Sequence, residues 1–184
     1  EMTAKYGTPY FSNYVNSDME PSDVRSMCCR LRLDLRELRK KSGGYFGSGE
    51  STGSIGVVTI NMPHIAYLSK NKEEFYARLD RIMGISARSL KEKRNVISGL
   101  LDAGLYPYTK AYISNFNHYY GTLGIVGMNE ACLNASWLKK DLMDSQAQAF
   151  ACEVLDFLNM KISKQDQKIN LEATPAESVC THFA

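Results

Sequence analysis

The sequence predicts an α/β fold that contains at least part of a parallel sheet or barrel. Short apolar runs typical of strands alternate with long segments of helical spacing, and glycine-rich turns separate them. Such alternation favours parallel strands, because the chain must cross back over the sheet before each new strand begins. The chain supplies only about four strands, too few to close a barrel of eight or more. We therefore expect it to be a fragment of a larger protein.

Two strands are expected early in the chain. Leucines at every second position of 31–35 alternate with charged residues, which predicts a strand with one apolar face. The β-branched run 55–61 suits a strand buried on both faces, and Pro63 ends it. The glycine-rich loop 43–53 between them has neither the Gly-Lys-Ser/Thr of a P-loop nor a well-placed G-x-G-x-x-G, so we interpret it as a hairpin connection.

A long helix is expected after the second strand. Asn71 is a candidate N-cap, and Glu74 three residues later completes a capping box. The apolar residues with helical spacing are Phe75, Leu79, Ile82, Met83, Leu90, Ile97, Leu100 and Leu101. Gly84 is expected to weaken or kink this helix, and Gly104 to end it.

The last third of the chain predicts a strand, a helix and a further strand. Residues 123–127 form a short buried strand or loop, and Ser145 is the expected N-cap of a second long helix. The inner stripe of that helix comprises Ala147, Phe150, Ala151, Val154 and Leu158. Residues 168–173 form a strand, which leads into a helix start at 174–178.

Composition and charge exclude several classes of protein. The 184 residues are 44% apolar and 23% charged with a net charge of +2, which is ordinary for one globular domain. No lysine and arginine run points to nucleic acid or an anionic membrane, and no apolar stretch reaches the ~18 residues that span a bilayer. Five irregularly spaced cysteines suit neither a disulfide framework nor a zinc motif. We therefore expect a cytoplasmic protein without a metal in this chain.

Cys28 and Cys29 are adjacent, and adjacent cysteines rarely bridge each other because a disulfide needs well-separated Cα atoms. Most free cysteines are small core residues. Two in succession point to opposite faces of an extended segment, so both cannot enter the same core. Arg25 and Arg30 nearby would favour the thiolate. The residues alone leave a structural and a reactive role equally open.

Two turns are candidate ligand sites. In 174–178, Thr174 suits an N-cap, Pro175 the first helical position and Glu177 the capping box. A well-capped helix explains all three residues and is favoured locally, whereas a phosphate site on free N–H groups is the alternative. The glycine-rich stretch 121–127 suits either a ligand loop or tight backbone packing inside a sheet.

Four stretches, taken in order, carry a resemblance over nearly the whole chain. They are 27–30 (Met-Cys-Cys-Arg), 56–63, 123–130, and 174–178 leading to 183–184. Together they resemble the anaerobic, or class III, ribonucleoside-triphosphate reductases. The resemblance implies a glycyl-radical enzyme with a ten-stranded α/β barrel, and residues 1–184 would form a single fragment of that catalytic domain.

The resemblance also implies a radical cysteine. In this family a radical on a glycine, here outside the chain, passes to a cysteine at the tip of a loop inside the barrel, expected at about 22–35. The radical cysteine of the family motif directly precedes arginine, which implies Cys29, with Cys28 as its neighbour and possible auxiliary thiol. The thiyl radical would remove the 3′ hydrogen of a ribonucleoside triphosphate, and the 2′ hydroxyl would leave as water.

The substrate site, cofactors and partners follow from the same resemblance. The turn at about 173–179 corresponds to the family's triphosphate site, which reverses the local interpretation of that turn. The implied substrate-binding residues are Thr174, Ala176, Glu177 and Ser178. We expect the glycyl radical and a zinc ion outside this chain and no cofactor bound within it. The expected partners are a radical-SAM iron–sulfur activating enzyme and a second copy in a homodimer, without nucleic acid or membrane.

Ser54 is a departure from the family pattern. Formate-using members carry asparagine just before the Val-Val-Thr strand, where this chain has Ser54. The replacement argues against formate as reductant and leaves a redoxin-type protein, and Ser54 itself is a further expected substrate-binding residue. The chain alone is expected to be inactive. Two rival interpretations stay open, namely a formate-lyase-like glycyl-radical acyltransferase and a non-catalytic fragment with structural cysteines.

Overall fold

The computed structural model divides into two compact units, Glu1–Gly49 and Glu50–Ala184, and each is described by itself. For the strands of the first unit the description covers the backbone alone. The described residues are Lys5, 24–26, 32–34, 53–174, Ala176 and Val179.

The first unit contains a pair of short antiparallel strands. β1 (Val24–Ser26) pairs with β2 (Arg32–Asp34), so that Arg25 lies opposite Leu33. β2 falls inside the strand predicted over 31–35. Residues 27–31, which join the two strands and include the adjacent cysteines, lie outside the described residues.

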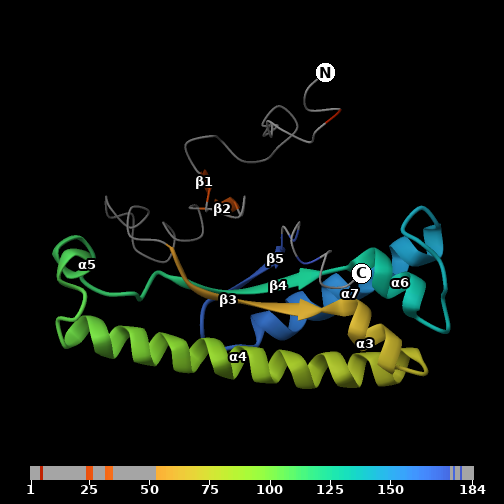
Figure 1. The fold of residues 1–184 in the computed structure, drawn as a ribbon, viewed down its shortest axis with the longest axis horizontal. Helices are drawn as coiled ribbons and strands as arrows, with labels where there is room; N and C mark the ends of the chain where they lie inside the picture. Colours follow the sequence, from red (N-terminus) through yellow and green to blue (C-terminus); the bar gives the residue numbers. More distant parts are fainter. Residues whose placement is uncertain are drawn as a thin grey trace. The chain divides into compact units, whose positions relative to one another are not determined.

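The second unit is built on a parallel sheet of three strands in the order β3–β4–β5 (Figure 1). These strands are β3 (Ser54–Asn61), β4 (Tyr120–Val126) and β5 (Ile169–Ala173). Val58 lies opposite Leu123, which in turn lies opposite Leu171. Sequential strands are neighbours because each returns to the start of the sheet through helices. The predicted α/β class with a parallel sheet is confirmed.

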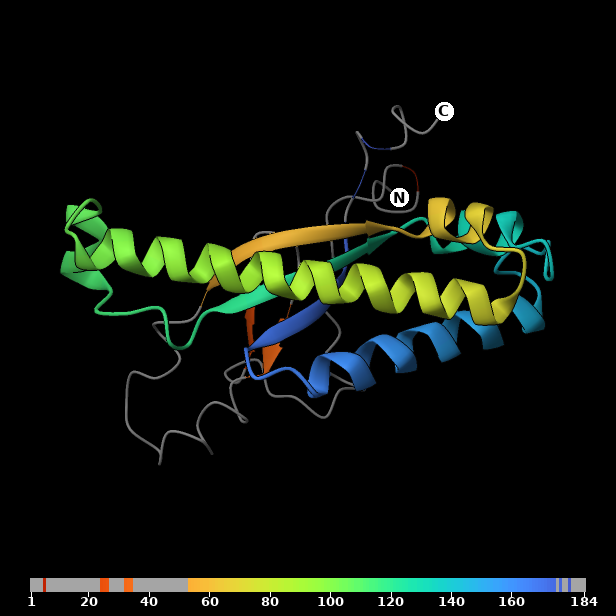
Figure 2. The ribbon, with the colours of Figure 1, turned by 90° about the horizontal axis from the view of Figure 1, so that it is seen from below.

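Helices form both connections and cover one face of the sheet. The first connection comprises α3 (Met62–Leu68), α4 (Lys72–Asp102) and α5 (Pro107–Tyr112). The second comprises α6 (Met128–Asn134) and α7 (Ser145–Ser163). Figure 2 shows α4 and α7 on the same side of the sheet, α4 over β3 and β4 and α7 next to β5. This arrangement leaves the opposite face of the sheet without a helix from the described residues.

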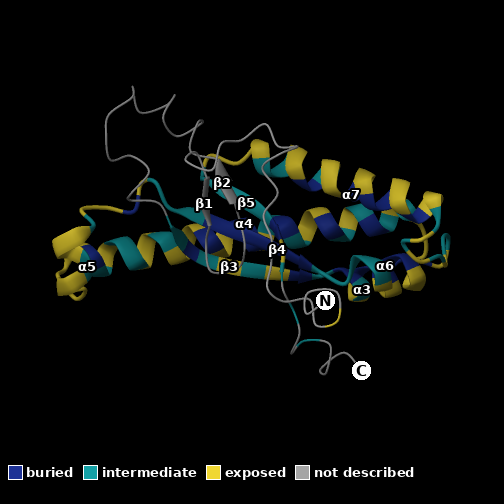
Figure 3. Cartoon of the chain, turned by 90° about the horizontal axis from the view of Figure 1, so that it is seen from above, coloured by how far each residue is buried: buried dark blue, intermediate teal, exposed yellow. Residues whose placement is uncertain are grey.

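The main core lies between the sheet and these two helices. Strand residues that point into it include Ile60, Leu123 and Ile125. All five residues of the predicted stripe of α7 are buried, and all but Ala151 belong to this core. Phe75 is fully buried and packs against the rings of Trp137 and Phe150. Figure 3 shows the exposed side of α7 facing away from this core. Each large side chain buried in this way stabilises the fold by about 1.5–3 kcal/mol.

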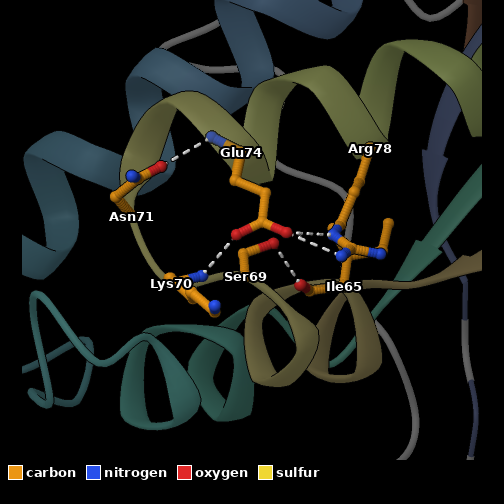
Figure 4. A network of polar contacts seen from close by, with 6 residues as sticks. All are labelled: Ile65, Ser69, Lys70, Asn71, Glu74 and Arg78. Carbon is orange, nitrogen blue, oxygen red and sulfur yellow. Dashed lines mark hydrogen bonds and ion pairs between the residues drawn. The ribbon is translucent and has the colours of Figure 1, made fainter.

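A polar network fixes the turn from α3 into α4 (Figure 4). Asn71 Oδ1 accepts from Glu74 N at 2.8 Å, which confirms the predicted N-cap. The Glu74 carboxylate accepts from Lys70 N at 2.9 Å and from Arg78, instead of from Asn71 N as in the usual capping box. Ser69 Oγ donates to Ile65 O at 2.7 Å and closes the end of α3.

Three local predictions need correction. The N-cap of α7 is Asp144, whose carboxylate accepts from Gln146 N at 2.8 Å, so the cap precedes Ser145 by one residue. α4 runs continuously through Gly84, because the intrahelical hydrogen bonds on both sides outweigh the glycine's low propensity. β3 is not buried on both faces, since Val57 is 43% exposed on the face without helices. Gly104 does follow the end of α4, with φ of +77°.

Candidate functional site

The face of the sheet opposite the helices is polar. Successive side chains of a strand alternate between faces, so the residues between the core positions gather here. Those of the strands are Ser54, Val57, Thr59, Asn61, Thr122, Gly124, Val126, Asn170 and Glu172, and Thr174 follows directly after β5. Parallel sheets are ordinarily apolar on both faces. A polar face on a parallel sheet therefore needs a further reason, and ligand binding is one.

Two threonines and a glycine meet at the carboxyl ends of the strands. Thr59 Oγ1 and Thr174 Oγ1 are 3.3 Å apart, across the backbone of Gly124. A Cβ at Gly124 would overlap Thr174 Oγ1 and lie 2.9 Å from Thr59 Oγ1, so the two hydroxyls can meet only over a glycine. Thr174 N also donates to Ile125 O at 3.0 Å, which fixes the start of the turn after β5.

Ser54 lies on the same face, nearer the amino ends of the strands. Its hydroxyl is 3.4 Å from Thr122 Oγ1 and 3.4 Å from Gly56 O, where a register shift interrupts the pairing of β3 with β4. Thr122 and Gly124 are two residues apart on β4, or about 7 Å along the strand. The structure thus places Ser54 and Thr174 on one face but does not bring their hydroxyls together.

Asn170 and Glu172 supply the polar groups of β5, and both lack partners. Glu172 is only 7% exposed, and its Oε1 is buried without a hydrogen bond in the described part of the chain. The same holds for Oδ1 and Nδ2 of Asn170. Unpaired buried polar groups are costly. By register they lie opposite Thr122 and Gly124, so they face the same space as the threonines.

Our sequence interpretation missed both of these residues. The signal that could have found them is the alternation within 168–173, where Ile169 and Leu171 are separated by Asn170 and Glu172. That pattern marks a strand with one apolar and one polar face.

The predicted turn after β5 is described in part. Thr174 lies at the site, and Val179 is helical, with its N–H donating to Ala176 O at 3.0 Å. This agrees with a helix start after the strand. Glu177 and Ser178, like Cys28 and Cys29, lie outside the described residues. The structure therefore neither gathers these four residues at the polar face nor removes them from it.

Neither of the two described free cysteines, Cys132 and Cys152, lies on the polar face. Cys132 is fully buried, and burial together with the charge of Glu130 raises the pKa of its thiol. Its Sγ lies 3.9 Å from Ala147 O, so it acts as a small core residue. Cys152 is exposed on α7, on the opposite side of the sheet from the polar face.

Tight packing accounts for the glycine-rich stretch 121–127. A Cβ at Gly121 would lie 3.1 Å from Leu90 Cδ1, and one at Gly127 would overlap Pro63. Gly127 also has φ of +75°, which glycine adopts without strain. Of the two interpretations of this stretch, backbone packing is the one that the contacts support, with Gly124 as the position that also shapes the polar face.

The described residues contain neither a membrane-spanning helix nor a cluster of metal ligands. None of their helices is long and apolar enough to cross a membrane. Nor do they contain a group of three or more histidine, cysteine, aspartate or glutamate side chains that could hold a metal ion. What the polar face offers is hydroxyl, amide and carboxylate groups, which suit hydrogen bonding to a polar organic ligand.

Fold and polar face together define an α/β protein whose parallel sheet has helices on one face and polar residues on the other. Comparison with known proteins agrees. The family model described as anaerobic ribonucleoside-triphosphate reductase matches residues 1–184. The anaerobic ribonucleoside-triphosphate reductase of Haemophilus influenzae is 26% identical over 176 residues, covering 85% of this chain and 24% of that protein. The chain therefore belongs to the anaerobic ribonucleoside-triphosphate reductase family, a family of oxidoreductases.

Solved structures of the Thermotoga maritima anaerobic ribonucleotide reductase share the fold. The structure with citrate in the active site has a TM-score of 0.61 and 25% identity, over 70% of this chain and 25% of that chain. The complex with dATP and CTP has a TM-score of 0.60 and 25% identity, over 70% and 23% of the two chains. The chain thus spans about a quarter of these relatives, as part of their α/β architecture.

Proposed function

We propose that this chain forms part of the catalytic wall of an enzyme that reduces ribonucleoside triphosphates to 2′-deoxyribonucleoside triphosphates without oxygen. The activity is proposed for the full-length protein, because the chain spans only 24% of its Haemophilus influenzae relative. The observation that carries the proposal is the polar face with its unpaired Asn170 and Glu172. Parallel α/β sheets bind ligands at the carboxyl ends of their strands, where Thr59 and Thr174 meet.

In this proposal Cys29 carries the thiyl radical. The radical removes the 3′ hydrogen atom of the substrate, the 2′ hydroxyl leaves as water, and the resulting substrate radical is then reduced. The antiparallel pairing of β1 with β2 supports a loop position for Cys29, since the short segment 27–31 joins the two strands. Cys28, directly beside it, would be an auxiliary thiol.

The turn after β5 would bind the triphosphate. Thr174 lies at the carboxyl end of the sheet, and Val179 N donates to Ala176 O a few residues later. N–H groups at a helix start favour phosphate oxygens, and the family motif adds Glu177 and Ser178. Asn170 and Glu172 face the same side and would bind ribose hydroxyls, which satisfies their buried polar atoms.

Further parts of the proposal concern groups that this chain does not supply. We place the glycyl radical and the zinc ion outside residues 1–184, and expect a radical-SAM iron–sulfur enzyme as activator and a homodimer as the assembly. Ser54 stands where formate-using members have asparagine, so a redoxin-type protein is the proposed reductant. The Ser54 hydroxyl faces Thr122, on the same face as the substrate-side residues.

The test is Cys29→Ser in the full-length protein, activated anaerobically and assayed for deoxynucleotide formation. We expect no product, whereas the matched variant Cys152→Ser, on the exposed side of α7, keeps full activity. An electron paramagnetic resonance signal of the glycyl radical in Cys29→Ser would show that folding and activation are intact. Product formation by Cys29→Ser would contradict the assignment.

A further inference from the structure

A second polar site lies at the amino ends of β4 and β5. It is an open pocket of about 370 Å³ between the second half of α4 and the loop that joins α7 to β5. Its lining residues are Lys91, Arg94, Asn95, Asn117, Gln165, Asp166, Gln167 and Lys168. Lys168 and Thr174 are six residues apart along β5, or about 20 Å. The pocket is therefore separate from the site proposed for the substrate.

The charge and chemistry of the pocket favour an anion. Three cationic side chains and one carboxylate line it, and the other four lining residues are amides. His118 adjoins the cluster, with Nδ1 3.4 Å from Lys168 Nζ. Ordinary small-molecule sites are mostly apolar. Because this lining has no aromatic or aliphatic side chain, it can recognise charge and hydrogen-bonding groups but not a stacked base.

Arg94 is the strongest single argument for an anionic ligand. Its guanidinium donates to Phe116 O at 2.8 Å and to Tyr119 O at 2.6 Å, which holds it in a fixed, half-buried position. No carboxylate of residues 53–174 pairs with it. Two of its five N–H donors are used, so others can bind an oxyanion in fork geometry. A half-buried charge without a counter-ion is stabilised when an anion binds.

The pocket wall is also fixed by a cross-element contact. Gln167 Nε2 donates to Ala87 O at 2.6 Å and ties the loop before β5 to α4. Lys91 and Arg94, one helical turn apart on α4, therefore face a loop whose position is held. Such preorganisation lowers the entropy cost of binding.

We propose that this pocket binds a phosphate chain of two or three phosphoryl groups, either free or as the tail of a nucleotide. Lys91 and Arg94 lie one helical turn apart on the same wall of the pocket of about 370 Å³, so a chain of phosphoryl groups can contact both side chains. Arginine with lysines is the donor set that recognises phosphate oxygens. The proposal is independent of the proposed reductase activity, because no lining residue belongs to the polar face.

Lysine footprinting on the full-length protein tests the proposal locally. Acetylation of Lys91 is followed by mass spectrometry as pyrophosphate is added, with exposed Lys164, outside the pocket, as internal reference. We expect saturable protection of Lys91 and constant labelling of Lys164. A second titration with ATP distinguishes a nucleotide from a free phosphate chain as the ligand. Protection of Lys91 at lower concentrations of ATP than of pyrophosphate indicates a nucleotide, and protection at equal concentrations indicates a free phosphate chain. Adenosine is expected to give none.

Matched variants assign the protection to the pocket. Arg94→Met should raise the half-protecting pyrophosphate concentration by about tenfold or more, while Arg88→Met, an exposed arginine of the same helix, should leave it unchanged. Because Arg94 also supports the backbone before β4, Asn95→Asp provides a near-isosteric second variant, with Asn159→Asp on α7 as its control. The proposal is overturned if pyrophosphate does not change the labelling of Lys91. It is also overturned if Arg94→Met and Asn95→Asp show the same protection of Lys91 as the wild type, or if sodium chloride of the same ionic strength lowers the labelling as much as pyrophosphate does.

Discussion

Glu172 is a residue whose burial lowers the stability of the fold and whose proposed role in binding would account for it. Its side chain is buried, and Oε1 has no hydrogen-bond partner in the described part of the chain. A carboxylate in that position lowers the stability of the fold unless a ligand completes its hydrogen bonds. Proteins retain such groups where binding or chemistry needs them. The same reasoning applies to Asn170 beside it on β5.

Glu172→Gln should therefore separate the two effects. We expect the free energy of unfolding to stay level or rise by about 1–3 kcal/mol, because a charge without a partner is removed. We expect kcat/KM for ribonucleoside triphosphate to fall, because the amide replaces one of the two acceptor oxygens of the carboxylate with an NH2 donor. Chemical denaturation and steady-state assays of the full-length protein measure both. Asp156→Asn, on the exposed side of α7, is the control and should change neither.

Of the two polar residues at the end of β5, Thr174 was singled out from the sequence and Glu172 was not. Thr174 is predicted because its neighbours match a family motif; the structure places it on the polar face, and its role in substrate binding stays a prediction. Glu172 lies in the same segment, but a strand glutamate is ordinarily solvent-exposed, and only the register with Gly124 shows that it is buried. The alternation in 168–173 is enough to mark Glu172 as part of a polar face, but the burial of that face depends on tertiary structure and cannot be predicted from these residues alone.

Among the elements, the long helices were the most predictable. Asn71 caps α4 as expected, and the full inner stripe of α7 is buried, because helical spacing and capping are local in sequence. The short helices α3, α5 and α6 were not predicted. Pro63, interpreted as the end of a strand, in fact opens α3, since proline suits the first helical turn as well as it ends a strand.

The turn between α3 and α4 gives a prediction about pH. The N–H of Lys70 and the guanidinium of Arg78 hold the pKa of Glu74 below its ordinary value of 4.5. A lowered pKa in the folded state stabilises the fold above the unfolded value, and this contribution is lost as the pH falls through the folded pKa. Glu74→Gln should therefore lower Tm at neutral pH, and its difference from the wild type should shrink below pH 4.5.

Thermal melts from neutral to acidic pH measure this difference. Glu73→Gln is the matched control, since Glu73 is exposed in the same helical turn and has none of these hydrogen bonds. We expect its Tm to differ little from that of the wild type at every pH. If the two variants showed the same pH dependence, the stabilisation would come from general charge effects of the first turn and not from the Lys70 and Arg78 contacts.

At the scale of the whole molecule, the three-stranded sheet has two strand edges that are unpaired among the described residues. β4 pairs on both sides, whereas β3 and β5 each pair on one side only among the described residues. Open strand edges leave backbone N–H and C=O groups without partners, and a barrel removes them by closing the sheet. Helices on one face and polar residues on the other also suit a barrel wall, with the polar residues turned inward. Membership of the reductase family agrees with this architecture.

This architecture predicts which amides of β5 are protected from hydrogen exchange in the full-length protein. Thr174 N donates to Ile125 O, so by the alternation of a parallel ladder the N–H groups of Leu171 and Ala173 point away from β4. If a further strand pairs with β5, exchange at Leu171 and Ala173 should be slow, comparable to that of Glu172, whose N–H points toward β4. Exchange resolved to single residues by NMR or mass spectrometry decides the matter. Rates at Leu171 and Ala173 close to those of an unstructured chain would show that β5 is an open edge, and the polar face would then belong to an open sheet.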